Sequence, residues 1–288
     1  MAEILTVVVT YNGMPWIERC LKSVHDSTMA SDLLVVDNGS TDGTADWIRE
    51  HFPETSLIEN SGNLGFAAAN NIGFRYAMAR DYKYVYLLNQ DAWVYPETFG
   101  TLARVFGQPG NRYGVLSPMQ MTAALTEMDP QFRKHCGKQV ARTSEETVPV
   151  PFVMAAHWMV SRECLADTGF FSPAFHHYGE DNDFSNRARY HGYSIGIVRT
   201  ASAVHDRLNR PRPKDYRMKL KVINAKASVA DPGKSPFTSL LGQTLLLALM
   251  GVRHLSPALL KGIGELWSTY PDLKAFRKSA KKKGAFMD

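Results

Sequence analysis

Over roughly the first 120 residues, short apolar runs alternate with amphipathic stretches, and only a few residues separate one from the next. The expected strands are residues 4–10, 33–37, 56–59 and 84–88, and the expected helices begin at Pro15, after residue 43 and at Phe66. Continuous apolar strands separated by helices are typical of a parallel sheet that is covered on both faces. The pattern therefore predicts an α/β fold whose ligands bind at the carboxyl ends of the strands.

After Pro118 the pattern is less regular, and we expect this half of the chain to complete the site. The expected strands are residues 139–142, 157–161 and 193–198, and the expected helices are residues 162–167 and 181–191. Residues 240–252 predict a strongly apolar helix, shorter than the about 20 residues needed to span a bilayer. This segment is expected to be a core or interfacial helix.

The three cysteines, Cys20, Cys136 and Cys164, show no C-x-x-C spacing and are odd in number. This usage argues for a reducing compartment rather than a disulfide framework. The first residues lack the basic start and the small-residue cleavage site of a signal peptide. We therefore expect a cytoplasmic protein.

The net charge of +5 is concentrated at one end, because eight Lys or Arg and three acidic residues lie between Gly251 and Asp288. The remainder of the chain is neutral, so a uniformly basic nucleic-acid-binding protein is not expected. A basic tail after an apolar helix is typical of a surface attracted to anionic lipid. A plain solvated tail is the alternative.

Polar residues collect where the expected strands end, at Asn12, Asp37-Asn38, Asn63 and Asn89-Gln90-Asp91. The carboxylate of Asp37 can accept a hydrogen bond from a base N–H, and Thr10 and Asn12 lie at the neighbouring strand end. These residues predict a nucleotide pocket, although Asp37 could instead cap the turn to the next helix.

Three carboxylates, Glu180, Asp181 and Asp183, fall within four positions after an aromatic and histidine-rich stretch. Like charges at this spacing repel, so we expect a raised pKa for at least one of them, as a general base requires. Asp183 is also four positions before Arg187, which suits an ion pair on one helix face. The alternative is a solvated first helical turn whose acids complement the helix dipole.

Four motifs, in order and at matching spacing, resemble glycosyltransferase family 2. They are Val7–Asn12, Val35–Thr44, Asn63–Gly73 and the Glu180-Asp181 cluster, and the resemblance covers about residues 4 to 205. It implies a GT-A fold, with a Rossmann-like, mostly parallel sheet flanked by helices, a nucleotide-diphosphate sugar donor, a divalent metal and inversion at the anomeric carbon. A likeness to the rhamnosyltransferase-like branch is suggestive. The chain then divides into a GT-A catalytic domain, 1–205, a basic loop and helix, 206–235, and a helical C-terminal extension, 236–288, apolar and then basic.

The resemblance also assigns roles to individual residues. It places Thr10, Asn12 and Asp37 at the nucleotide, Asp91 and His205 at the metal, and Asp181 as the base, with Glu180 orienting the base or the acceptor. Asn89 stands where the family has an acid and would contact the ribose or a metal-bound water. A hard cation such as Mg²⁺ or Mn²⁺ can be held by one carboxylate together with diphosphate oxygens and water. Gly65 would let the backbone approach a ligand or make a tight turn, and Asn70 would bond the donor or simply face the helix surface.

Together these features predict a cytoplasmic, inverting, metal-dependent glycosyltransferase, peripheral on the inner face of the plasma membrane. Its donor would be a UDP- or dTDP-sugar, and its acceptor a glycan or a polyprenyl-linked sugar. A nucleotidyltransferase would need a glycine-rich basic loop after the first strand, where this chain has Tyr11–Pro15. A catalytically impaired binding homologue is the other alternative, against which the retained Asp91 and Asp181 argue.

Overall fold

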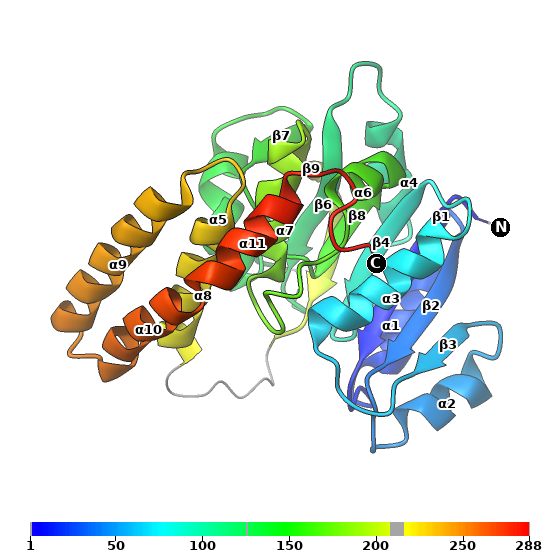
Figure 1. The fold of residues 1–288 in the computed structure, drawn as a ribbon. Helices are drawn as coiled ribbons and strands as arrows, with labels where there is room; N and C mark the ends of the chain where they lie inside the picture. Colours follow the sequence, from blue (N-terminus) through cyan, green and yellow to red (C-terminus); the bar gives the residue numbers. More distant parts are fainter. Residues whose placement is uncertain (1, 125, 208–215, 288) are drawn as a thin grey trace.

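The computed structural model describes residues 2–124, 126–207 and 216–287. Within these residues one sheet of nine strands runs in the order β3-β2-β1-β4-β8-β6-β9-β5, and β7 pairs with β9 (Figure 1). The strands are β1 (Ile4–Thr10), β2 (Ser31–Asp37), β3 (Ser56–Glu59), β4 (Tyr84–Asn89), β5 (Ala92–Val94), β6 (Tyr113–Met121), β7 (Thr147–Val150), β8 (His157–Ser161) and β9 (Ser194–His205).

The N-terminal half of the sheet is parallel, as the sequence predicts, and it is covered on both faces. Along β1, Leu5 and Val7 face one core while Ile4 and Val8 face the other, because successive side chains of a strand point to opposite faces. Helices α1 (Ile17–His25), α2 (Thr44–His51) and α4 (Thr98–Phe106) contribute to one core and α3 (Phe66–Met78) to the other. The expected α/β fold with flanking helices is confirmed.

The second half makes the sheet mixed, since β8 runs antiparallel to both β4 and β6, while β6 and β9 are parallel. Here one prediction is wrong: residues 139–142 end the helix α5 (Pro130–Ala141) instead of forming a strand. The helix starts there because Asp129 caps it, accepting hydrogen bonds from two backbone N–H groups, with Pro130 as the first helical residue. Its buried face, Phe132, Cys136 and Val140, has four-residue helical spacing.

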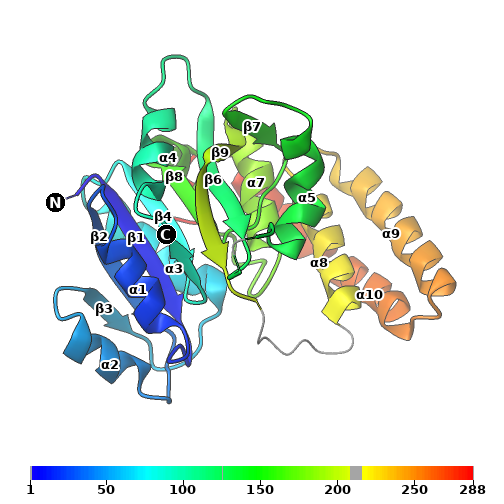
Figure 2. The ribbon, with the colours of Figure 1, turned by 180° about the vertical axis from the view of Figure 1, so that it is seen from behind.

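The remaining helices are α6 (Arg162–Thr168), α7 (Glu180–Tyr190), α8 (Tyr216–Ala230), α9 (Pro236–Arg253), α10 (Pro257–Ser268) and α11 (Tyr270–Ala280). The helices α8 to α11 pack around a third apolar core, to which Phe175, between α6 and α7, also contributes. Both ribbon views place α9 at one end of the molecule and β3 at the other (Figures 1 and 2). Among the described residues, no helix is both long and apolar enough to span a membrane. The sequence also predicts a basic, proline-broken loop over 207–214, and all of it except Arg207 lies outside the described residues.

Candidate functional site

The sheet register places three of the predicted site residues side by side at one edge. Thr10, the last residue of β1, pairs with Asp37 of β2, and Asn89 of β4 pairs with Val9 on the other side of β1. The chain turns after each of these strands, so the polar residues at the carboxyl ends face the same crevice. This edge is therefore where the sequence predicts a ligand.

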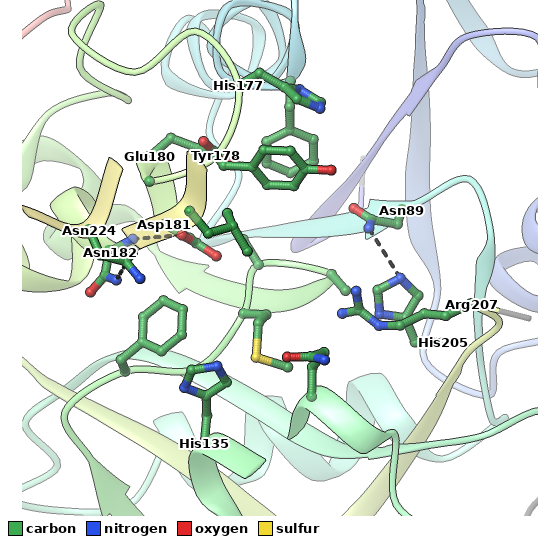
Figure 3. A pocket seen from close by; sticks show the side chains of 18 of the residues that line it. Asn89, His135, His177, Tyr178, Glu180, Asp181, Asn182, His205, Arg207 and Asn224 are labelled. Carbon is green, nitrogen blue, oxygen red and sulfur yellow. Dashed lines mark hydrogen bonds between the residues drawn. The ribbon is translucent and has the colours of Figure 1, made fainter. Parts of the chain in front are cut away.

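A cavity of about 230 Å³ lies beside this edge (Figure 3). It joins four of the predicted site residues, namely Asn89, Glu180, Asp181 and His205. The residues not predicted as site members that also line it include Phe66, Gln131, His135, Phe152, Met154, His177, Tyr178, Asn182, Arg207, Tyr216, Leu220 and Asn224. The other predicted residues, Thr10, Asn12, Asp37, Gly65, Asn70 and Asp91, do not line this cavity.

The acidic cluster opens α7 at the cavity wall. Burial, and secondly the charge of Asp181, raise the pKa of Glu180 to about 8, and only 6% of this residue is exposed. Burial also raises the pKa of Asp181 to about 6, against hydrogen bonds from the backbone N–H groups of Asn182 and Ala155 and the positive charge of Arg207. At neutral pH the site thus holds a protonated Glu180 beside an ionised Asp181. The expected raised pKa is present, and its main cause is burial rather than repulsion.

The third carboxylate of the cluster has a structural role. Asp183 Oδ2 lies 2.8 Å from Arg187 Nε, and both side chains are buried, as the sequence spacing predicts. Arg187 also donates hydrogen bonds to the carbonyl oxygens of Thr168 (2.6 Å) and Phe170 (2.7 Å). This pair joins α7 to the end of α6 and to the turn that follows, and so fixes the helix start that carries Glu180 and Asp181.

The predicted metal ligands lie together, with His205 lining the cavity and Asp91 outside its lining. His205 Nε2 is 3.5 Å from Asp91 Oδ1 and 3.5 Å from the amide nitrogen of Asn89. Burial lowers the pKa of His205, so the imidazole is neutral and keeps a lone pair for a cation. Two adjacent ligands that each lie about 2.1 Å from an octahedral ion are about 3 Å from each other. The 3.5 Å distance between Asp91 Oδ1 and His205 Nε2 is close to this separation.

The protein therefore offers two ligands, Asp91 and His205, to a divalent metal. No cluster of three or more His, Cys, Asp or Glu suited to a metal occurs in the described part of the chain. Water, diphosphate oxygens or the Asn89 carbonyl would have to complete the coordination shell. The strand end that carries His205 is held by His157, which lies 3.0 Å from the Val204 carbonyl oxygen and 2.9 Å from the Tyr86 hydroxyl.

Asp37 caps the turn that follows β2, which the sequence left open as the alternative to a nucleotide contact. The Asp37 carboxylate accepts hydrogen bonds from the backbone N–H groups of Gly39 (3.1 Å) and Ser40 (2.9 Å), and from the Ser40 hydroxyl. Each carboxylate oxygen can accept more than one hydrogen bond, so a base N–H can still be accommodated. Nearby, Thr10 donates to Gln90 Oε1 (2.8 Å) and Asn12 Oδ1 accepts from the backbone N–H of Thr41 (2.9 Å). These bonds hold the loops after β1, β2 and β4 together.

Gly65 and Asn70 both act locally at the start of α3. Gly65 has a φ of 82°, and a Cβ there would lie 2.5 Å from the carbonyl oxygen of His176, so this glycine permits a close backbone approach within the protein. Asn70 is buried and donates to the Phe66 carbonyl oxygen at 2.9 Å, one turn earlier in the helix. The structure thus shows an intramolecular contact for each residue, and the ligand role of both stays a prediction.

Arg207 is the most informative residue that sequence reasoning missed. Its Nε donates to Asp129 Oδ2 at 2.8 Å, and Asp129 is the buried cap of α5. In Figure 3, Arg207 lies beside His205, and Asp181 and Asn182 lie on the opposite side of the cavity. The signal was its position two residues after His205, at the end of β9. No such signal exists for Tyr216, Leu220 and Asn224, which α8 brings to the cavity from beyond the loop.

Residues 6–169 match the model of the family described as glycosyl transferase family 2. The chain belongs to glycosyltransferase family 2. This confirms the family resemblance, and with it an enzyme that transfers sugars from nucleotide sugars.

Two curated relatives show the extent of sequence similarity. The low-salt glycan biosynthesis hexosyltransferase Agl10 of Haloferax volcanii is 23% identical, over 71% of this chain and 67% of its own length. The N-acetylglucosaminyl-diphospho-decaprenol L-rhamnosyltransferase of Mycobacterium tuberculosis is 26% identical, over 71% of this chain and 76% of its own. The similar proteins thus include a rhamnosyltransferase, as the suggested branch anticipates.

Solved structures agree on the fold. TarS (residues 1–349) of S. aureus has a TM-score of 0.63 at 14% identity, over 99% of this chain and 88% of that TarS fragment. The mannosyltransferase PcManGT from Pyrobaculum calidifontis, in complex with GDP-Man and Mn²⁺, has a TM-score of 0.57 at 18% identity, over 98% and 88% of the two chains. These likenesses confirm the GT-A fold of this glycosyltransferase.

Proposed function

We propose that this family 2 enzyme is an inverting, metal-dependent glycosyltransferase of polysaccharide biosynthesis. It moves a sugar from a UDP- or dTDP-sugar to a hydroxyl of a glycan or of a polyprenyl-linked acceptor. The observation that carries the proposal is the cavity itself, in which an ionised Asp181 faces His205 and Arg207. A base and the groups suited to a diphosphate thus share one space, as sugar transfer requires.

In the proposed reaction Asp181 accepts the proton of the acceptor hydroxyl while that oxygen attacks the anomeric carbon. The new bond forms on the face opposite the departing nucleoside diphosphate, which inverts the configuration at that carbon. A pKa of about 6 suits Asp181 to this task, because the group is ionised at neutral pH yet basic enough to take a proton. Glu180, protonated at the same pH, donates a hydrogen bond that orients the acceptor or the base.

The nucleotide is proposed to occupy the crevice at the ends of β1 and β2, with Asp37, Thr10 and Asn12 nearest the base and Gly65 and Asn70 bordering the donor. Support comes from the register that places Thr10 beside Asp37. Arg207 lines the same cavity as Asp181 and would bind the diphosphate, since a guanidinium matches phosphate oxygens in a bidentate geometry.

Asp91 and His205 are the residues that would hold a divalent cation, with Asn89 contacting a bound water or the ribose. Bound Mn²⁺ or Mg²⁺ would neutralise the negative charge that develops on the leaving diphosphate. The neutral His205 imidazole beside the Asp91 carboxylate supports this assignment. So does PcManGT, a protein of the same fold that was crystallised with GDP-Man and Mn²⁺.

A polyprenyl-linked acceptor is supported by the relatives. The mycobacterial relative is named for an N-acetylglucosaminyl-diphospho-decaprenol acceptor, and the Micrococcus luteus relative is named undecaprenyl-phosphate mannosyltransferase. Such an acceptor fits a cell-envelope role and a protein that is peripheral on the inner face of the plasma membrane.

Donor binding and transfer test the proposal together. UDP- and dTDP-sugars are screened by thermal shift with Mn²⁺, because a ligand at 100 times its Kd stabilises the fold by about 2.7 kcal/mol. The stabilising sugar is then incubated with a polyprenyl-diphosphate acceptor, and the anomeric configuration of the product is read by NMR. We expect an inverted product. Binding without transfer to any such acceptor would instead support the catalytically impaired homologue, and a retained configuration would contradict the mechanism.

A further inference from the structure

The outermost helix, α9, exposes a face that is almost wholly apolar. Its exposed large side chains are Phe237, Leu241, Leu245, Leu246, Leu249 and Val252, with exposed fractions from 45% to 70%. Most of them follow a four-residue spacing and so lie on one side of the helix. The opposite side buries Leu240, Leu247 and Gly251 against the neighbouring helices. A helix that is apolar on both sides normally has an apolar phase or a partner on each.

The apolar surface continues past the end of α9. Leu255, in the connection to α10, is 88% exposed, and Leu260 and Trp267 of α10 are also exposed. We call these side chains, with the exposed ones of α9, the α9–α10 face. Soluble monomers rarely expose contiguous apolar patches of more than a few hundred Å², so a surface of this kind marks an interaction site.

The charged residues of α9 and of the first part of α10 all have one sign, and Glu265, near Trp267, pairs with Lys226 of α8. From Lys234 to Gly264 the sequence contains no Asp or Glu, and no charged residue at all lies between Lys234 and Arg253. Arg253 and Lys261 are exposed within or beside this apolar segment, and Lys234, also exposed, pairs with Asp231 at 2.9 Å at its start. Aliphatic side chains bordered by cations match an anionic phospholipid surface, where the apolar groups enter the acyl boundary and the cations contact phosphates.

We propose that the α9–α10 face lies on an anionic phospholipid bilayer, with α9 in the plane of the membrane surface. Helix α9 has 18 residues and does not meet the length and hydropathy needed to span a membrane. A position in the plane of the membrane surface is consistent with this. A second copy of the chain would also cover the apolar side chains, but it would not account for the lack of carboxylates over this segment.

This places the membrane contact on a different segment from the basic tail that the sequence suggests. Lys283 of the tail pairs with Asp167 of α6 at 2.9 Å, and the Ala285 carbonyl oxygen accepts a hydrogen bond from the backbone N–H of Phe170. Arg277 donates to the carbonyl oxygen of Asp231 at 3.1 Å. The tail therefore packs on the catalytic region, whereas the α9–α10 face has no covering element among the described residues.

Helix α8 connects the proposed membrane surface to the cavity. Tyr216, Leu220 and Asn224 of α8 line the cavity. Val222, on another side of α8, packs on Gly262 of α10, and a Cβ added to Gly262 would lie 2.3 Å from the Val222 side chain. A membrane-held acceptor would thus meet the cavity wall next to the bilayer. This last step rests on the proposed function, but the membrane contact itself does not.

Vesicle flotation of the full chain tests the proposal directly. Wild type is expected to float with vesicles of phosphatidylcholine and phosphatidylglycerol and to bind less to phosphatidylcholine alone. The variant L241Q/L245Q/L249Q should lose at least about tenfold in partitioning, because three exposed apolar side chains no longer enter the lipid. The matched control K281Q/K282Q/K283Q alters three exposed side chains of the tail and should partition like wild type.

Three outcomes would overturn the proposal. In the first, the wild-type protein does not bind the vesicles. In the second, the L241Q/L245Q/L249Q variant keeps the wild-type melting temperature and still floats with the vesicles. In the third, only the tail variant loses vesicle binding. Sedimentation without lipid tests whether a second copy of the chain covers the face instead. If the wild type is a dimer, the L241Q/L245Q/L249Q variant is a monomer and flotation is unchanged, the face serves self-association. Transfer to a soluble acceptor by the same preparations reports on the reaction separately, so a failure of the proposed function is distinguishable from a failure of the membrane contact.

Discussion

Replacing Glu180 by Gln should change how the stability of the enzyme depends on pH. Burial and the charge of Asp181 raise the pKa of Glu180 from 4.5 to about 8 in the folded state. Between these values the folded protein keeps the proton while the unfolded chain loses it, so the free energy of unfolding of wild type falls as pH rises. Below about pH 4.5 both states are protonated, and above about pH 8 the loss is complete.

The magnitude follows from the shift. Each pKa unit corresponds to 1.36 kcal/mol, so the full shift of about 3.5 units corresponds to about 5 kcal/mol at most. Between about pH 5 and pH 8.5, the stability of E180Q relative to wild type should increase by about 2–4 kcal/mol. Any constant difference, from packing or from the amide's hydrogen bonds, cancels in this comparison across pH.

Urea denaturation at several pH values measures the effect. The matched control is E163Q on α6, which replaces an exposed glutamate by the same amide and should follow the wild-type stability at every pH. A constant difference between E180Q and wild type across this range would refute the protonated, buried state of Glu180 and the division of roles built on it.

Three further predictions concern the parts that support the site. R187M should lower the free energy of unfolding by about 3–5 kcal/mol, because it leaves the buried Asp183 carboxylate without its cation. The double variant R187M/D183L should lower the free energy of unfolding by less, and an equal loss in both variants would contradict the role of the pair. G65A should destabilise the fold by about 1–3 kcal/mol through its positive φ and the contact with His176, whereas G62A, whose Cβ would meet nothing within 4 Å, should be nearly neutral by thermal denaturation. H205A should raise the Mn²⁺ concentration for half-maximal activity by at least roughly tenfold, and an unchanged Mn²⁺ titration would remove His205 from the metal site.

Strands that consist of one uninterrupted apolar run were predictable from the sequence. Residues 4–10 and 157–161 form strands with the predicted bounds, and burial on both faces accounts for their nearly continuous apolar runs. Residues 56–59 also have the predicted bounds, as the partly exposed edge strand β3. No strand was predicted over 113–121, where β6 contains Gly114 and Pro118 within an otherwise apolar segment. The strand predicted at 139–142 was wrong because the signal that starts the helix, Asp129-Pro130, lies ten residues earlier.

The site was predictable where motif and strand end coincide, and not where distant segments meet. The cavity joins Asn89, Asp181 and His205, each placed by its own motif. Arg207 follows the His205 motif by two residues, but its bond to Asp129, the cap of α5, arises only after β9 packs beside β6, so no local pattern signals that contact. Likewise, burial rather than charge spacing sets the pKa of Glu180, and burial is a property of the folded chain.

The proton acceptor is the central claim, and the variant D181N tests it most directly. The Asn side-chain oxygen can keep the hydrogen bond from the backbone N–H of Asn182, which is 2.8 Å long in the wild type, so fold and donor binding should persist. The rate of sugar transfer at saturating donor and acceptor should fall by about 10²–10⁴-fold, the usual contribution of a general base. A D181N enzyme that binds the nucleotide sugar like wild type and transfers the sugar at a near wild-type rate would contradict the account.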